Sequence, residues 1–154
     1  MSFIQTIKSY NPTFWVANFL QIIERGAWFG VFSLLGLYLV ASTDEGGLGL
    51  SHIQKGNILA NVTAIQFFLP LFFGVIADRI GYKLSLIIAF VIIGVGYYLM
   101  GTVDSYWAIY LAFLFAAMGG SFFKPVASGI IARTTDEKTS TMGFGLFYLM
   151  ANIG

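Results

Sequence analysis

An acid and a base stand side by side in an apolar stretch near the start of the chain. Glu24 and Arg25 interrupt a run from about residue 13 to residue 41 that is otherwise mostly apolar. About 20 apolar residues suffice to cross a bilayer, so this run is long enough for a transmembrane helix. An ionised side chain at the centre of such a helix costs about 3 kcal/mol on insertion scales. Two adjacent charges at that depth need a partner, and they indicate a functional site.

Lys124 is a third charge inside a later apolar run. Helical rise places Glu24 about 15 Å and Lys124 about 13 Å from the same end of their spans, so the two reach a similar depth. Two pairs remain open, Glu24 with Arg25 and Glu24 with Lys124. In either case one acid faces two bases, and one positive charge is left over. This excess charge could bind an anion such as a substrate carboxylate, or it could pair with a charge on helices outside this chain. A static ion pair that fixes packing is the structural alternative, but an unbalanced triple serves that purpose poorly.

The composition places these charges in a membrane protein. The 154 residues are 58% hydrophobic and 10% charged, whereas a soluble domain carries about 25% charged residues. The net charge of +1 gives no indication of nucleic-acid binding. With no cysteine and a lone His52, the sequence offers no metal site, and it contains no phosphate loop or nucleophile motif. We therefore expect neither an enzyme nor a bound cofactor.

Hydropathy organises the chain into successive transmembrane helices. The first apolar run is too long for the core of a signal peptide and should remain as a helix. The fifth run is cut short at Gly154, so we expect the N-terminal piece of a longer protein with no separate soluble domain. The predicted helices cover residues 13–41, 53–77, 84–103, 106–132 and 142–154.

The distribution of basic residues predicts the orientation. Loops on the opposite side carry Lys55 with the acids Asp44, Glu45 and Asp104. Lys and Arg concentrate in cytoplasmic loops, so the N-terminus should be cytoplasmic. The five basic residues on the N-terminal side are Lys8, Arg79, Lys83, Arg133 and Lys138.

Polar side chains form stripes on two of the predicted helices. Asn18, Gln21 and Arg25 recur with a helical spacing on the first, and Glu24 and Trp28 widen that stripe. Such stripes face a bundle interior or a wet cavity, either as hydrogen-bonded glue between helices or as part of a transport path. The second helix carries Gln54, Asn57, Asn61 and Gln66.

Small residues and prolines predict local geometry. Gly26 with Gly30, and the pair Gly119-Gly120, should mark close helix contacts. Ser51 should cap the second helix. The proline rings remove backbone donors, so the helices should bend there, as helices beside transport sites often do. The two prolines concerned are Pro70 and Pro125.

One loop resembles the signature of the major facilitator superfamily between its second and third helices. It runs from Gly74 through Asp78-Arg79 and Gly81 to Lys83, on the predicted cytoplasmic side. From the residues alone, Asp78 and Arg79 end a helix at the interface and Gly81 allows a tight turn. The resemblance implies that Gly74, Asp78, Arg79, Gly81 and Lys83 form a cytoplasmic gate loop.

Three further segments resemble the proton-dependent oligopeptide transporter family within that superfamily. Gln21 to Arg25 is similar to its Glu-x-x-Glu-Arg motif. Gly119 to Pro125 is similar to its Gly-x-Gly-x-x-Lys-Pro segment, and Phe147 to Gly154 to its Phe-Tyr-x-x-x-Asn-x-Gly signature. Each motif alone is weak, but together they follow the family's order along the whole chain.

This resemblance implies a major facilitator fold of twelve helices in two six-helix halves. This chain would hold the first four helices and part of the fifth, with alternating access around a central site. Proton coupling is implied for Glu24 and Arg25, and a link from the proton site to a substrate carboxylate for Lys124. The remaining substrate contacts are expected at Asn18, Gln21, Trp28, Asn61, Gln66 and Asn152.

Several positions differ from the family pattern. Gln21 stands where the family has a glutamate that takes a proton, and Gly26 replaces an aromatic residue after the arginine. Phe67 stands where many members have a tyrosine that faces the substrate, and Ser121 and Val126 replace a glycine and an asparagine. These differences bear on peptide specificity and on the number of protons moved.

The sequence therefore predicts an integral protein of a bacterial plasma membrane that acts as a proton-coupled symporter of small peptides or related carboxylate-bearing solutes. Its energy source would be the proton gradient. Its partners would be the lipid bilayer, the small substrate and the remaining helices of the transporter. A facilitator or drug/proton antiporter of the same superfamily is one alternative, and a non-transporting truncated protein is another.

Overall fold

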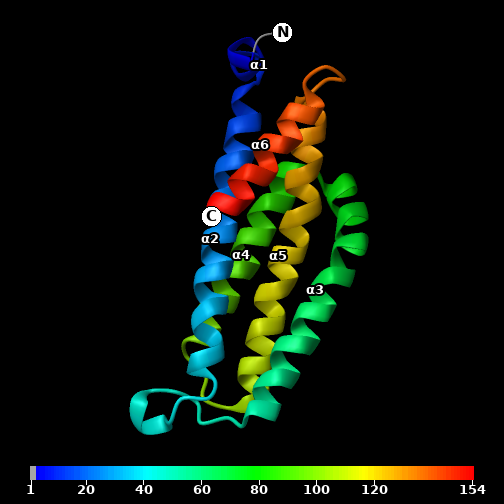
Figure 1. The fold of residues 1–154 in the computed structure, drawn as a ribbon. Coiled ribbons are helices and arrows are strands. Elements are labelled where there is room, and N and C mark those ends of the chain that lie inside the picture. Colours follow the sequence, from blue (N-terminus) through cyan, green and yellow to red (C-terminus); the bar gives the residue numbers. More distant parts are fainter. Residues whose placement is uncertain (1–2) are drawn as a thin grey trace. The chain divides into compact units, whose positions relative to one another are not determined.

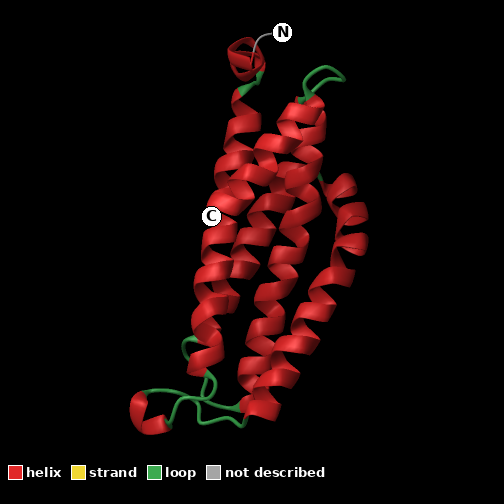
Figure 2. Cartoon of the chain, viewed as in Figure 1, coloured by secondary structure: helices red, strands yellow, loops and turns green. Residues whose placement is uncertain are grey.

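The computed structural model describes residues 3–154, which are helical except for connecting loops (Figures 1 and 2). The prediction of an all-α fold is confirmed, and the helices α2 to α6 overlap the five predicted ranges, with ends that differ by up to three residues. The bounds are α1 Phe3–Ser9, α2 Pro12–Tyr38, the short 3-10 helix η1 Thr43–Glu45, α3 His52–Ile80, α4 Tyr82–Met100, α5 Tyr106–Thr134 and α6 Ser140–Ile153.

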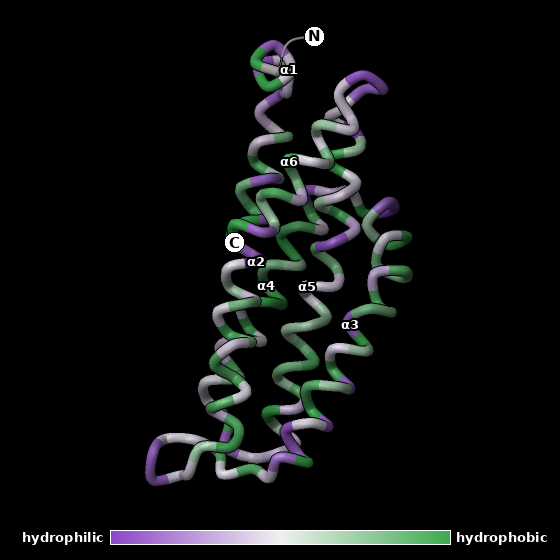
Figure 3. The backbone as a smooth tube through the Cα atoms, viewed as in Figure 1, coloured by the Kyte–Doolittle hydropathy of each residue, from purple (hydrophilic) through white to green (hydrophobic). Residues whose placement is uncertain are grey.

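Among the described residues, α3, α4 and α5 are long and apolar enough to cross a membrane. Figure 3 shows why, because apolar residues run along the helices while hydrophilic residues gather at the loops. The 27 residues of α2 rise about 40 Å, enough to span a bilayer, although polar residues interrupt its apolar sequence. The expectation of a membrane protein is therefore supported by the helices themselves.

The ends of α3 are fixed by local chemistry. Ser51 caps the N-terminus, as predicted, through a capping box in which its hydroxyl accepts from the Gln54 amide and the Gln54 side chain accepts from the Ser51 amide. At the other end Gly81 has φ +88°, which a residue with a side chain rarely adopts. This glycine is the single residue between the end of α3 and the start of α4.

The chain divides into two compact units. The first combines Met1–Gly30 with Val126–Gly154, and the second is Val31–Pro125. The first unit therefore holds most of α2, the end of α5 and all of α6. The second holds the end of α2, all of α3 and α4, and most of α5.

In the first unit, α6 packs against α2 near the start of both helices. The Tyr10 hydroxyl donates to the Thr139 carbonyl oxygen over 2.8 Å, and the Tyr10 ring stacks on Phe14 with 4.0 Å between ring centroids. A Cβ at Gly143 would lie 2.6 Å from the Thr135 side chain, whereas it would be at ordinary contact distance from the Phe14 ring and the Tyr10 hydroxyl. The hydrogen bond between Tyr10 and Thr139 joins segments that are far apart in the sequence.

Replacing Tyr10 with phenylalanine should lower the free energy of unfolding by about 1 kcal/mol. The ring stacking would persist, but the buried Thr139 carbonyl would lose its donor. Thermal unfolding of the purified protein measures the change. Tyr98→Phe is the matched control, because Tyr98 is 72% exposed. Equal melting temperatures of Tyr10→Phe and Tyr98→Phe would show that the hydrogen bond of Tyr10 does not stabilise the fold.

The same helices approach each other again at Gly26. A Cβ at Gly26 would lie 3.3 Å from the Gly154 carbonyl oxygen, so the predicted close contact at Gly26 is confirmed. A Cβ at Gly30 would meet nothing within 4 Å, so the prediction for that glycine is wrong in this structure. The two glycines are four residues apart and share one face of α2, and the end of α6 approaches that face at Gly26.

The loop before α6 is held by Asp136 and Thr139. One carboxylate oxygen of Asp136 accepts from the Lys138 amide, the Thr139 amide and the Thr139 hydroxyl, and the Asp136 amide donates to the Thr139 hydroxyl oxygen. The hydrogen bond from the Thr139 hydroxyl is the main reason that the pKa of Asp136 is lowered. Burial first, and then the Asp136 charge, raises the pKa of Tyr10, which keeps that hydroxyl a donor.

The lowered pKa of Asp136 predicts a pH dependence of stability. A carboxyl group whose pKa is lower in the folded state stabilises the fold above its unfolded pKa, and the contribution is lost as the pH falls through the folded pKa. Wild type should therefore melt above Asp136→Asn at pH 6, and the gap should close on acidification below the ordinary value of 3.8. Melting temperatures measured from pH 6 to below pH 3.8 test this difference between wild type and Asp136→Asn, with Glu137→Gln as the control. A gap that is constant with pH would contradict it.

In the second unit, α4 and α5 pack closely against one another. A Cβ at Gly96 would overlap Ala116, and one at Gly119 would overlap Ile93 and the backbone of Ala89. The predicted packing role of Gly119 is therefore confirmed. Small residues on both helices let the backbones approach, as is common in membrane bundles.

Helix α5 also packs on α3 within this unit. The Ser121 hydroxyl donates to the Ala117 carbonyl of its own helix over 2.7 Å and to the Gln66 carbonyl of α3 over 3.2 Å. The Phe73 and Phe122 rings lie 5.0 Å apart. These contacts fix the register of the two helices around Gln66.

Both prolines lie inside helices that continue through them. Pro70 is inside α3 and Pro125 inside α5, and neither helix is interrupted. Figure 1 shows that α3 changes direction along its length, as a missing backbone hydrogen bond allows. The sharpness of a bend at either proline stays a prediction.

Candidate functional site

Between Asn18 and Trp28, helix α2 buries its polar side chains, and several apolar side chains of the helix are exposed. Asn18, Gln21, Glu24 and Trp28 are each less than 9% exposed. The prediction that this stripe faces away from lipid is confirmed. This inverted arrangement is typical of a helix whose polar face lines a protected interior within a membrane. The exposed apolar residues of the same segment are Trp15, Val16, Phe19, Ile23 and Phe29.

The sequence left two partners possible for Glu24, and in the structure Glu24 pairs with Arg25. The Arg25 Nε lies 2.5 Å from Glu24 Oε2, and its Nη2 lies 2.6 Å from Oε1. The Glu24 side chain is 2% exposed and that of Arg25 14%. Neighbouring residues on a helix do not face each other, so the two long side chains must turn toward one another. This bidentate geometry gives the buried carboxylate a counter-ion and two charge-assisted hydrogen bonds, which offset the cost of its burial.

The polar face near this pair has unused hydrogen-bonding capacity. The Asn18 amide donates to the Phe14 carbonyl over 2.9 Å, but its buried oxygen Oδ1 finds no donor among residues 3–154. A buried polar atom without a partner is uncommon in native proteins. The Asn18 oxygen is therefore available to accept a hydrogen bond from a ligand.

In the second unit, Lys124 lies against an aromatic ring. Its Nζ is 5.5 Å from the centre of the Phe67 ring, within the range of a cation–π interaction. Lys124 is half-buried, whereas Phe67 is 73% exposed. The family tyrosine that Phe67 replaces would add a hydroxyl here, and phenylalanine leaves only the ring face for the ammonium. The position of Lys124 relative to Glu24 stays a prediction, since the two residues belong to different units.

Gln66 precedes Phe67 and is the most buried polar residue of α3, with 4% exposure. Its carbonyl accepts from Ser121, and its side-chain Nε2 has no acceptor among residues 3–154. The unit thus places an unpaired amide donor next in sequence to the ring that Lys124 contacts. An amide donor and an ammonium together suit a ligand that carries carboxylate or carbonyl oxygens.

The loop from Gly74 to Lys83 is built from the end of α3 and the start of α4. The Tyr82 hydroxyl donates to Asp78 Oδ1 over 2.9 Å, which ties the two helix ends across Gly81. A Cβ at Gly74 would lie 3.5 Å from the Pro125 ring, an ordinary contact. Arg79 and Lys83 are exposed. The gate function of this loop stays a prediction.

Comparison with known proteins decides the family. The model of the Major Facilitator Superfamily matches residues 15–154. The chain belongs to the Major Facilitator Superfamily. The resemblance seen in the sequence is thereby confirmed, and the family is one of membrane transporters. No solved structure gives a significant match.

The relatives within the superfamily carry several different names. The chain is 26% identical over 145 residues to "Dipeptide and tripeptide permease B" of Xenorhabdus bovienii, covering 92% of this chain and 29% of the relative. It is 27% identical to "Multidrug resistance protein MdtH" of Sodalis glossinidius (88% and 32%) and 30% identical to a "Na(+), Li(+), K(+)/H(+) antiporter" of Planococcus maritimus (96% and 34%). The chain therefore spans about a third of the length of these curated relatives.

Two of the residues that the sequence predicts to contact the substrate are exposed within the part of the chain that the structure describes. Asn61 is exposed on α3, as is Asn57. Asn152 is also exposed, and its amide donates to the Tyr148 carbonyl of its own helix over 2.7 Å. Gln54, assigned to the same stripe as Asn61, instead caps α3. A role for Asn61 or Asn152 in substrate binding remains a prediction for the complete transporter.

Two residues that organise these sites have roles that their sequence pattern does not predict. Ser121 replaces a glycine of the family pattern, and its hydroxyl joins α5 to α3. Phe67 replaces a tyrosine of that pattern, and its ring contacts Lys124. Helical spacing offered a signal for Ser121, because it lies three residues before Lys124 and therefore on nearly the same face.

Proposed function

We propose that the complete transporter is a proton-coupled symporter that moves small peptides or related carboxylate-bearing solutes by alternating access. The observation that carries this proposal is the buried Glu24 carboxylate held by Arg25. In helices α2 to α6, the other acid is Asp78, near the end of α3. Glu24 is thus the acidic group of these helices that lies deep enough to carry a proton between the two sides.

Proton coupling would work through competition for the Glu24 carboxylate. A proton that binds the carboxylate removes its charge and weakens both hydrogen bonds from Arg25. The guanidinium stays charged, so it then seeks another anion or carbonyl oxygen. Any motion that changes this pairing would link protonation to helix position. Gln21 cannot take a proton, which leaves Glu24 as the proton carrier of α2.

Lys124 is the proposed contact for the substrate carboxylate. Its ammonium rests on a ring face, and a carboxylate would bind that ammonium far more strongly than a ring does. The free Nε2 of Gln66 supplies a further donor on the same unit. The names of two peptide-transporting relatives agree with such a ligand, one of them the "Di-/tripeptide transporter" of Lactococcus lactis.

A facilitator or an antiporter is the second candidate. The relatives named for multidrug resistance and for cation/proton antiport favour it. In an antiporter the same Glu24–Arg25 pair would exchange a proton for the substrate. The expected location is a bacterial plasma membrane with the N-terminus in the cytoplasm, since the relatives named here are bacterial proteins.

Uptake into liposomes tests the proposal. The complete protein would be reconstituted, and labelled di- and tripeptides would be offered outside at a pH below that of the lumen. A symporter accumulates peptide, and a protonophore abolishes the accumulation. Uptake that only equilibrates would identify a facilitator, and accumulation under the reversed gradient would identify an antiporter. Either result would contradict symport.

A further inference from the structure

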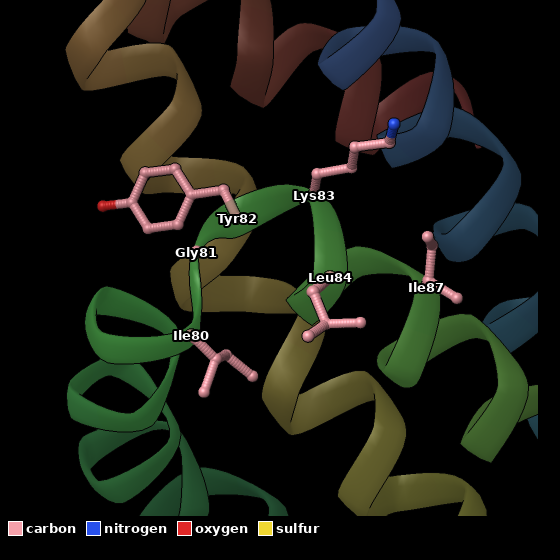
Figure 4. Close-up of a pocket in the computed structure, with 6 residues that line it drawn as sticks. All are labelled: Ile80, Gly81, Tyr82, Lys83, Leu84 and Ile87. Carbon is pink, nitrogen blue, oxygen red and sulfur yellow. The ribbon is translucent and has the colours of Figure 1, made fainter.

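A shallow groove lies at the junction of α3 and α4 (Figure 4). Its volume is about 420 Å³. The groove exists because Gly81 joins the helices through a single residue and brings the end of one against the start of the other. The residues that line it are Ile80, Gly81, Tyr82, Lys83, Leu84 and Ile87.

The groove is apolar and open. Ile80, Leu84 and Ile87 are 40%, 50% and 52% exposed, respectively. Figure 4 shows Ile80 and Leu84 on one side of the turn, whereas the Lys83 side chain extends to the other side. The junction thus separates an apolar surface from a charged group over a short distance, as the boundary between acyl chains and headgroups does.

The apolar surface continues along α4 beyond the groove. Leu84, Ile87, Val91 and Val95 follow one another at helical spacing, and each is at least 43% exposed. These residues form a straight stripe about 16 Å long by helical rise. One leaflet of a bilayer has a hydrocarbon thickness of about 15 Å, half of the whole core. The stripe therefore matches the length of an acyl chain that starts at the groove.

The charge at the head of the stripe favours an anion. Arg79 and Lys83 are exposed there with one acid, Asp78, whose carboxylate accepts from Tyr82. The junction therefore has a net positive charge. A lysine at this level keeps its ammonium near the headgroups while its stem covers apolar surface. Basic residues next to a transmembrane helix attract anionic lipids, each contributing about 1 kcal/mol.

We propose that the α3–α4 junction binds one anionic phospholipid. Its acyl chain lies along Ile80, Leu84 and Ile87 and continues on the α4 stripe, and its phosphate pairs with the Lys83 ammonium, with Arg79 nearby. A protein partner fits less well, because the positive charge stands at one end of an apolar stripe about as long as one leaflet is thick, as a phosphate stands at one end of an acyl chain.

Native mass spectrometry of the purified complete protein, titrated with phosphatidylglycerol or phosphatidylcholine, tests the site. Wild type should retain phosphatidylglycerol preferentially, and Lys83→Gln should weaken its binding about fivefold, the loss of one basic contact. Lys83→Arg should bind as wild type does. Lys138→Gln is the matched control, since Lys138 is exposed in the α5–α6 loop and does not line the groove.

The apolar half is tested with Ile87→Ser, which should weaken the binding of both lipids while keeping the preference for the anionic one. Equal binding of the two lipids by wild type would overturn the proposal. So would an undiminished affinity of Lys83→Gln, or an equal loss in Lys138→Gln, because either would mean that general surface charge attracts the lipid.

Discussion

Replacing Arg25 with glutamine should lower the free energy of unfolding by about 3 to 5 kcal/mol. The reason is that Glu24, whose side chain is 2% exposed, would lose both of its hydrogen bonds from the guanidinium. The carboxylate would then remain buried without its counter-ion or would bind a proton. Either change removes the charged pair on which the packing of this face of α2 depends. Thermal unfolding of the detergent-purified protein measures the loss.

Two further variants distinguish the pair from general effects of charge. Arg79→Gln removes an exposed arginine near the end of α3, and it should change stability by no more than about 0.5 kcal/mol. The double variant Glu24→Gln/Arg25→Gln removes both charges and should recover much of the stability lost by Arg25→Gln, because two neutral amides can bond to one another. A double variant that is less stable than Arg25→Gln would show that the two side chains act independently.

Replacing Glu24 with glutamine should abolish the accumulation of substrate without preventing its movement. One proton moving down a gradient of one pH unit releases about 1.4 kcal/mol, enough for a tenfold concentration ratio. With the membrane potential held at zero, wild type should therefore accumulate a neutral peptide about tenfold, and Glu24→Gln only to equal concentrations. Uptake of labelled peptide into liposomes measures both ratios.

Exchange experiments separate coupling from folding in that variant. With peptide on both sides and no gradient, Glu24→Gln should still exchange labelled for unlabelled peptide, because no net proton movement is required. Glu45→Gln is the matched control, since Glu45 is exposed in the loop after α2 and should accumulate peptide as wild type does. Loss of exchange together with accumulation would mean that Glu24 is required for the fold or for binding.

The helices and the polar face of α2 could be predicted from the sequence because a bilayer imposes simple rules. Each span needs about 20 apolar residues, and a polar residue within it must avoid lipid. Asn18, Gln21 and Glu24 share one face of α2 by helical spacing alone, and all three are buried. The cap at Ser51 could be predicted as well, since it depends on residues three positions apart.

The remaining features depend on which helix faces cover one another, and spacing within one helix does not determine this. Asn61 carries the same polar signal as Gln66, yet Asn61 is exposed and Gln66 is buried against the helix that bears Ser121. Gly26 and Gly30 are equivalent in sequence, and only the first lies against another backbone. The pairing of Glu24 with Arg25 likewise depends on side-chain geometry that a pattern of residue types does not contain.

Whether Glu24 carries the coupled proton is tested most directly by measuring the proton movement that a gradient of substrate drives. A pH-sensitive dye in the lumen of liposomes containing the complete transporter reports protons that enter with an inward gradient of peptide. If Glu24 carries the coupled proton, the lumen acidifies with wild type and its pH stays unchanged with Glu24→Gln, although both proteins exchange peptide. Acidification by Glu24→Gln at the wild-type rate would contradict the claim that Glu24 carries the coupled proton.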